Sequence, residues 1–269
     1  MYRRILVGYL DTEPGRDALA LGTSLTQASG AELMVVTADD RDGEDLAQIA
    51  RSQSADLIVL GATHRGQLGK VISGATMDGL LADAPCDVAI APPGFGSRSA
   101  ASAEWRPLDG NGRDAGMRVI GVGYDGSDAS KRGLAVATEM ALANGAALRV
   151  FTVAGKPHLS PTGDQPPAPG VPTEDEAMRE ELHEAVRALP SEVRALPVFL
   201  RGFAADELIG AAKLGVDLLV LGCRGGGGLR RLFHTSVSGT VVEKTKCPVL
   251  ITPRAVAARA PAVLAEAPA

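Results

Sequence analysis

A glycine-rich segment follows an apolar run in the second half of the chain. The run ends at Gly222, Cys-Arg leads to four glycines at 225–228, and Thr235-Ser236 stands where a helix is predicted to begin. Glycines expose backbone N–H groups and let an anion approach closely. A helix amino terminus adds free N–H groups and the positive end of the helix dipole. These residue types in this order are typical of a phosphate-binding site.

Neighbouring side chains favour the same interpretation. Arg224 and the pair Arg230-Arg231 can neutralise phosphate, and a guanidinium can bind it through two hydrogen bonds. Asp125, which follows another apolar run, could accept hydrogen bonds from a ribose or an adenine. Each feature also has a simpler explanation: glycines after a strand form turns, Ser236 can be only a helix cap, and Asp125 begins a common turn sequence. Their combination in one place favours a binding site.

The chain contains an internal repeat. The apolar runs RILVGY and RVIGVGY both end in Gly-Tyr, with Tyr9 and Tyr124 offset by 115 residues. The runs DLIVLG and DLLVLG, which end at Gly61 and Gly222, are offset by 161 residues. We therefore distinguish a first repeat (residues 1–95) and a second repeat (117–254), of which the first lacks 46 residues.

Apolar runs in the second repeat alternate with helical segments. Thr173 to Glu176 fits a capping box, Ser127 or Asp128 can cap the preceding helix, and Asn144-Gly145 suits its left-handed end. Strands separated by helices predict right-handed βαβ units and a parallel sheet covered on both faces. The predicted strands are 118–124, 147–153, 193–200, 216–222 and 248–252, and the predicted helices are 128–143, 173–189, 205–214 and 235–244.

We predict an α/β fold of two tandem open parallel-sheet domains with helices on both faces and strand order 3-2-1-4-5. The first repeat passes from its second strand (32–37) to a helix at 44–52 and so lacks the third strand. Since that strand lies at a sheet edge, its loss leaves the core pairing intact. The expected divisions are a shortened domain at 1–95, a linker at 96–116, a complete domain at 117–254 and a mobile tail at 255–269.

Composition excludes several classes of partner. A net charge of -5 and a pI near 5.5 argue against nucleic-acid binding, which needs clustered cations. No apolar run reaches the ~18–20 residues of a membrane span, and the amino terminus lacks the features of a signal peptide. Three cysteines without a C-x-x-C spacing indicate reduced thiols rather than a disulfide or zinc site. We therefore expect a cytoplasmic protein that binds neither nucleic acid nor membrane.

The chain resembles the universal stress protein family, in tandem, over about residues 3–92 and 117–254. The family pattern is glycine, two residues, glycine, nine residues, glycine, then Ser or Thr. The second repeat has this spacing, except that Thr235 stands where the family has the last glycine. The resemblance implies that ATP or a related adenine nucleotide, with or without Mg²⁺, binds in the second repeat. The implied binding residues are Asp125, Val153, Gly222, Arg224, Gly225, Thr235, Ser236 and Val237.

The first repeat departs further from the family pattern. His64 replaces the middle glycine, Ala75 replaces the hydroxyl residue, and Leu10 aligns with Asp125. We therefore expect weak or no nucleotide binding there. By the resemblance, the first repeat completes a pseudo-dimer through the last strands, about 88–91 and 249–252. The sequence leaves homodimerisation open.

Two functions remain in competition. The first is an adenine-nucleotide-binding stress-response or regulatory protein with little or no catalysis, favoured by Asp125, the glycines and Ser236. The second is a structural or partner-binding module that keeps the fold, favoured by Thr235 and the altered first repeat. An enzyme is disfavoured because the sequence shows no P-loop lysine, paired nucleophile and base, or metal-ligand cluster. Slow ATP hydrolysis stays open. A dehydrogenase is disfavoured because the first strand–helix turn lacks G-x-G-x-x-G.

Overall fold

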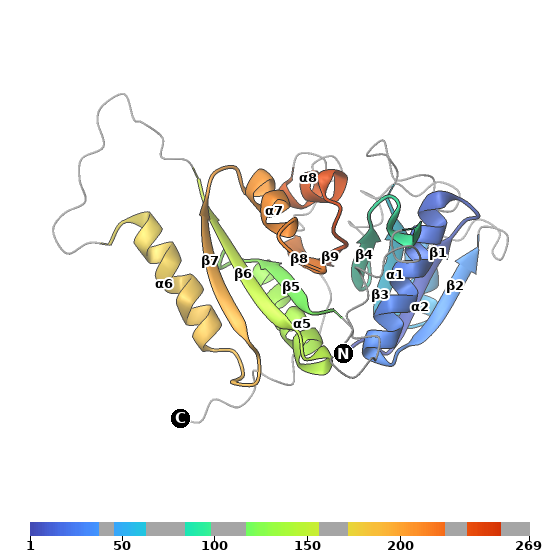
Figure 1. The fold of residues 1–269 in the computed structure, drawn as a ribbon. Helices are drawn as coiled ribbons and strands as arrows, with labels where there is room; N and C mark the ends of the chain where they lie inside the picture. The colour runs from blue at the N-terminus through green and yellow to red at the C-terminus, as the bar shows by residue number, and fades with distance from the viewer. Residues whose placement is uncertain (38–45, 63–83, 98–116, 156–171, 224–235, 254–269) are drawn as a thin grey trace.

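The computed structural model describes residues 1–37, 46–62, 84–97, 117–155, 172–223 and 236–253. The first repeat contributes β1 (Arg4–Tyr9), β2 (Glu32–Thr37), β3 (Leu57–Gly61) and β4 (Asp87–Ala91). The second repeat contributes β5 (Val119–Gly123), β6 (Ala147–Ala154), β7 (Ala195–Arg201), β8 (Leu218–Cys223) and β9 (Val249–Pro253). All of these strands belong to one continuous sheet in the order β2-β1-β3-β4-β9-β8-β5-β6-β7 (Figure 1).

The sheet is parallel within each repeat and antiparallel where the repeats meet. β4 and β9 form the antiparallel pair, with Val88 opposite Ile251 and Ile90 opposite Val249. The second repeat therefore has strand order 3-2-1-4-5, and the described strands of the first repeat follow the same order without the third. The predicted fold class and the predicted pairing of the last strands are both confirmed.

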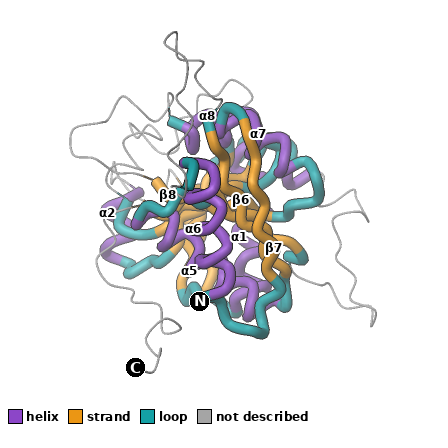
Figure 2. Tube along the Cα trace, turned by 90° about the vertical axis from the view of Figure 1, so that its left-hand side faces the viewer, coloured by secondary structure: helices purple, strands orange, loops and turns teal. Residues whose placement is uncertain are grey.

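Helices cover both faces of the sheet. One face carries α1 (Glu13–Ser29), α5 (Asp128–Asn144) and α6 (Glu174–Arg187), and the other carries α2 (Leu46–Ser52), α7 (Ala204–Ala212) and α8 (Val237–Lys244). Neighbouring strand residues point to opposite faces, so Leu6 packs with α2 while Val7 packs with α1. Figure 2 views the molecule from the β7 end, where α6 lies beside β7.

Helix ends form where the sequence places capping residues. Ser127 caps α5 by accepting a hydrogen bond from the N–H of Ser130, and Gly145 ends α5 at a φ of 63°. Thr173 and Glu176 form both hydrogen bonds of the predicted capping box at the start of α6. β7 begins two residues later than predicted because Val193 still donates its N–H to Pro190 in a turn.

The segment after β4 is held to the first repeat by a buried carboxylate. Asp17, 1% exposed, accepts hydrogen bonds from the N–H groups of Gly94 (2.8 Å) and Gly96 (2.7 Å). Phe95 between them is 3% exposed. The packed part of the first repeat thus extends to Gly96, where the linker was predicted to begin. The rest of that linker, most of the proline-rich 155–172 segment and the 255–269 tail lie outside the described residues.

The described ranges contain neither a membrane-spanning helix nor a cluster of metal ligands. None of the helices there is both long and apolar enough to cross a membrane. The same ranges contain no group of three or more His, Cys, Asp or Glu side chains placed to hold a metal ion. Cys86, Cys223 and Cys247 are free thiols, and Cys86 and Cys247 are buried.

Candidate functional site

The strand order of the second repeat reverses between β5 and β8. From β5 the chain proceeds to β6 on one side, whereas β8 lies on the other, with Gly123 paired to Leu221 near the strand ends. Open α/β sheets bind ligands at the carboxyl ends of the strands beside such a reversal. Asp125 follows β5 and Gly222 lies in β8, so the fold brings these two predicted site residues to adjacent strand ends.

Asp125 is exposed and organises the turn into α5. The Oδ1 atom of Asp125 accepts two hydrogen bonds from Ser127, one from the backbone N–H at 3.1 Å and one from the side-chain hydroxyl at 2.5 Å. An ionised carboxylate has about four acceptor positions on its two oxygens. Asp125 therefore holds the turn in place while its carboxylate is exposed at the surface.

Gly222 has a packing role that is separate from any ligand. A Cβ at this position would lie 2.4 Å from the carbonyl carbon of Ala129 at the start of α5. At the equivalent Gly61, a Cβ would lie 1.8 Å from the carbonyl oxygen of Pro14 in α1. Glycine is required in both repeats because the helix start lies directly against the strand. Retention of Gly61 therefore says nothing about ligand binding in the first repeat.

The amino terminus of α8 lies at the same edge of the sheet. Since α8 connects β8 to the parallel strand β9, its first residues lie at the carboxyl ends of these strands. The helix predicted from about residue 235 begins at Val237 with Ser236 as its N-cap, and the Ser236 hydroxyl oxygen accepts a hydrogen bond from Gly239 N–H at 3.0 Å. Val237, in the first turn, is 42% exposed. The predicted site residues Arg224, Gly225 and Thr235 lie outside the described residues.

Val153 lies near the carboxyl end of β6, as predicted from the sequence, and is half-buried. Thr152 beside it donates its hydroxyl hydrogen bond to the carbonyl of Tyr124 at 2.9 Å, which ties β6 to the end of β5. Burial, with a smaller effect from Glu181, raises the pKa of Tyr124. The ends of β5 and β6 are therefore joined by a hydrogen bond and adjoin an acidic side chain of α6.

Gly126 explains how α6 comes so close to this edge. Its φ is 74°, and a Cβ there would lie 2.2 Å from a carboxylate oxygen of Glu181. Glycine thus provides both the positive φ and the space for the acidic side chain. Sequence reasoning treated Asp125-Gly126 as a common turn and gave no indication that Glu181 approaches it.

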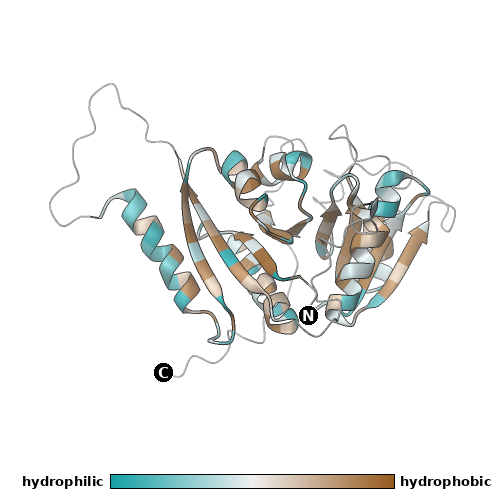
Figure 3. Cartoon of the chain, viewed as in Figure 1, coloured by the Kyte–Doolittle hydropathy of each residue, from teal (hydrophilic) through white to brown (hydrophobic). Residues whose placement is uncertain are grey.

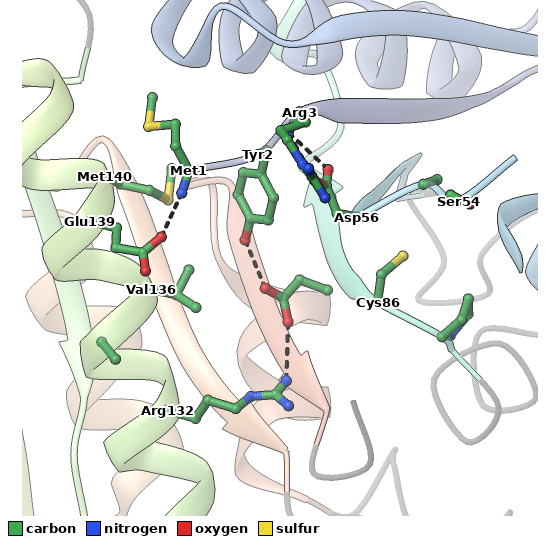
Figure 4. Close-up of a pocket in the computed structure, with 14 residues that line it drawn as sticks. Met1, Tyr2, Arg3, Ser54, Asp56, Cys86, Arg132, Val136, Glu139 and Met140 are labelled. Carbon is green, nitrogen blue, oxygen red and sulfur yellow. Dashed lines mark hydrogen bonds and ion pairs between the residues drawn. The ribbon is translucent and has the colours of Figure 1, made fainter. Parts of the chain in front are cut away.

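A second feature, which sequence reasoning missed, lies where the repeats meet. A cavity of about 260 Å³ lies between α5 and the residues around the starts of β1, β3 and β4 (Figure 4). Tyr2 donates to Asp87 Oδ2 at 2.9 Å, and Arg132 on α5 donates to Asp87 Oδ1 at 3.1 Å. Asp87 is 9% exposed, and burial together with Asp87 raises the pKa of Tyr2 well above its ordinary value. This Tyr2–Asp87–Arg132 network joins the repeats.

Comparison of the repeats contains the signal for this network. Asp87 occupies the position of Pro248, and Arg132 occupies the position of the buried Asp17. At both positions the two repeats carry residues of different charge, and these residues meet at the junction. The carboxylate of Asp87 is matched by the guanidinium of Arg132, so the network is electrically balanced without a ligand.

The described residues fit an adenine nucleotide in part. An exposed acceptor, Asp125, lies at the strand reversal, and a capped helix start, at Ser236, lies at the same edge. Gly222 gives no independent support because α5 occupies the space beside it.

The comparisons with known proteins identify the family. A model described as the Universal stress protein family matches residues 38–92 and 116–253, well over half of the chain. The chain is 37% identical over 143 residues to "Universal stress protein in QAH/OAS sulfhydrylase 3'region" of Thermus aquaticus, covering 50% of this chain and 98% of that protein. It is 33% identical over 141 residues to universal stress protein YxiE of Bacillus subtilis (strain 168), covering 48% of this chain and 95% of that one.

Solved structures share the fold over nearly the whole chain. A universal stress protein from Archaeoglobus fulgidus DSM 4304 matches with a TM-score of 0.61 at 15% identity, covering 93% of this chain and 96% of that one. A functionally unknown protein from Pseudomonas aeruginosa PAO1 matches with a TM-score of 0.59 at 18% identity, covering 94% and 92%. Because the family model matches two segments, one in each repeat, the chain belongs to the universal stress protein family as a tandem member.

Proposed function

We propose that this chain is a stress-response protein that binds ATP or a related adenine nucleotide in its second repeat only, with little or no catalysis. The observation that carries the proposal is the exposed carboxylate of Asp125, placed beside the end of β8 where the strand order reverses. Asp125 would accept a hydrogen bond from the ribose. The amino terminus of α8, with Ser236, would face the phosphates.

The remaining contacts follow from the family resemblance. Arg224, Gly225 and Thr235 would complete the phosphate site, and Mg²⁺ could accompany the phosphates. Val153 and Val237, half-buried and exposed respectively, would provide apolar contacts.

The asymmetry between the repeats supports a single site. In the first repeat the position of Asp125 is occupied by Leu10, whose carbonyl accepts the N–H of Thr12 at 2.7 Å. The nearest carboxylate, Asp11, pairs instead with Arg16 at 2.8 Å. The first repeat therefore has leucine, not a carboxylate, at the position that Asp125 occupies in the second repeat.

Isothermal titration calorimetry of the full chain with ATP and with AMP tests the proposal. The wild type should bind about one nucleotide per chain. Asp125→Ala should weaken binding about 10–100-fold, because a hydrogen bond to a charged group contributes about 1.5–3 kcal/mol. Asp11→Ala, the matched change in the first repeat, should leave affinity unchanged.

Asp125→Ala also removes the carboxylate that orders Ser127, so a second variant separates the two effects. Asp125→Asn keeps an oxygen acceptor for the Ser127 hydrogen bonds but removes the charge, and it should retain the fold with intermediate affinity. A wild type that releases no heat with either nucleotide would refute the proposal.

A structural or partner-binding module is the second candidate function. Two observations favour it: packing alone explains Gly222, and helix capping explains the hydroxyl of Ser236. The same titration decides between the candidates, because a module of this kind would release no heat with ATP or AMP.

A further inference from the structure

The outermost strand of the first repeat, β2, has an uncovered apolar face. Val35 is 42% exposed and Leu33 is half-buried, whereas the equivalent Val150 and Leu148 of β6 are 0% and 1% exposed. The positions are equivalent because Val35 pairs with Val7 as Val150 pairs with Val122. In the second repeat, β7 and α6 cover β6. Among the described residues of the first repeat, the element after β2 is α2, and none corresponds to β7 or α6.

The free edge of β2 also presents backbone groups. Glu32 donates its N–H to the carbonyl of Arg3 at 2.8 Å, so its backbone is bonded to the β1 side. In a strand, the backbone N–H and C=O groups of successive residues point to opposite sides, so those of Leu33 and Val35 point away from β1. Within the described ranges β1 is the only strand paired with β2. Such an edge is a template for another strand.

The opposite edge of the sheet is protected against pairing. β7 carries Pro197, which has no N–H to donate, near its middle. Arg201 at its end forms an ion pair with Asp175. A head-to-tail contact between β2 of one molecule and β7 of the next is therefore disfavoured, which leaves β2 as the edge available for association.

We propose that β2 pairs antiparallel with β2 of another molecule of this chain, forming a closed two-fold dimer. A two-fold axis perpendicular to the sheet at Met34 keeps each helix layer on its own side and places Leu33 opposite Val35 of the other molecule. The outward N–H and C=O groups of both residues can then bond to each other. Glu32 faces Val36 of the other molecule, so no like charges are opposed.

The chain already contains a junction of this geometry. β4 and β9 pair antiparallel around Ala89 and Leu250, which are equivalent positions in the two repeats. The proposed dimer would repeat that arrangement at β2. Figure 3 shows that β2 is hydrophobic along most of its length, whereas α6 at the other end of the molecule is largely hydrophilic. The pairing would extend the sheet across both molecules and cover the exposed Val35.

Sedimentation velocity of the full chain over a micromolar concentration series tests the proposal. The wild type should be a dimer at the upper concentrations. Val35→Lys should weaken dimerisation about tenfold or more, since an edge lysine opposes strand pairing. Leu196→Lys is the matched control, because Leu196 on β7 is 57% exposed, and it should leave the dimer unchanged.

Thermal unfolding shows whether each variant is folded before its mass is interpreted. Val35→Thr, which preserves the branched shape and strand preference, should still dimerise and excludes a general folding defect as the cause. The proposal is overturned if the wild type is monomeric throughout the series. It is equally overturned if a dimer survives Val35→Lys with unchanged affinity, or if Leu196→Lys dissociates it.

Discussion

Replacing Arg132 with methionine should destabilise the whole chain, because it leaves Asp87 with one partner fewer at the junction of the repeats. The side chains of Arg132 and Asp87 are 24% and 12% exposed. Breaking a buried ion pair by removing one partner costs about 3–5 kcal/mol. Arg132 keeps some contact with water and Tyr2 still donates to Asp87, so we expect about 2–3 kcal/mol.

Urea unfolding of the full chain, followed by circular dichroism, measures this loss. The matched control is Arg187→Met, since the Arg187–Glu180 pair is 62% and 63% exposed. We expect that change to cost at most about 0.5 kcal/mol.

A double-mutant cycle with Asp87→Asn isolates the pairwise contribution. The double variant should be less destabilised than the sum of the two single variants, with a coupling of about 1–2 kcal/mol. If Arg132→Met costs no more than Arg187→Met, or if the cycle shows no coupling, the junction does not depend on this ion pair.

Three further changes test other parts of the structure. Gly61→Ala should lower the free energy of unfolding, measured with urea, by more than about 3 kcal/mol because the new Cβ would collide with the backbone of α1. Gly145→Ala is the control: its Cβ would meet no atom within 4 Å, so the loss should be only about 1 kcal/mol. Burial raises the pKa of Cys86 and of Cys247 from 9.0 to about 12, so the folded state holds these protons more tightly than the unfolded chain. The contribution of these thiols to the free energy of unfolding should be fully present below pH 9 and should be lost as the pH rises from 9 towards 12. Cys247→Ala should therefore reduce the fall of the urea midpoint over this pH range, and identical profiles for the variant and the wild type would contradict the assignment. Leu182→Ala should cost about 2–4 kcal/mol, since this side chain is 1% exposed, and should increase hydrogen exchange in α6 more than elsewhere.

Local patterns predicted most of the fold. The strands of the first repeat and α5 with its Ser127 cap follow from apolar runs and capping residues that act over a few positions. The antiparallel junction was predicted through the family resemblance and is confirmed by the β4–β9 register. Strand boundaries differed where a turn, such as that at Val193, used backbone groups assigned to the strand.

The long-range contacts could not be predicted in the same way. Tyr2, Asp87 and Arg132 come from three separate segments of the chain, and Asp and Arg usually face solvent. The sequence also suggested a phosphate-binding role for Gly222. The structure explains this glycine by packing, because the start of α5 lies against it and leaves no room for a side chain. Such contacts depend on how whole elements pack.

The β4–β9 pairing has a consequence for how the chain is made. β4 ends at Ala91 and its partner β9 begins only at Val249, so β4 is synthesised well before β9. At roughly 5–20 residues per second, β4 waits on the order of 10–30 seconds on the ribosome for its partner. During that time the first repeat has open strand edges on both sides, β2 and β4. Nascent chains on one messenger could pair through β4 before their own β9 emerges, so the order of synthesis itself creates a period in which domain-swapped assemblies compete with the native junction.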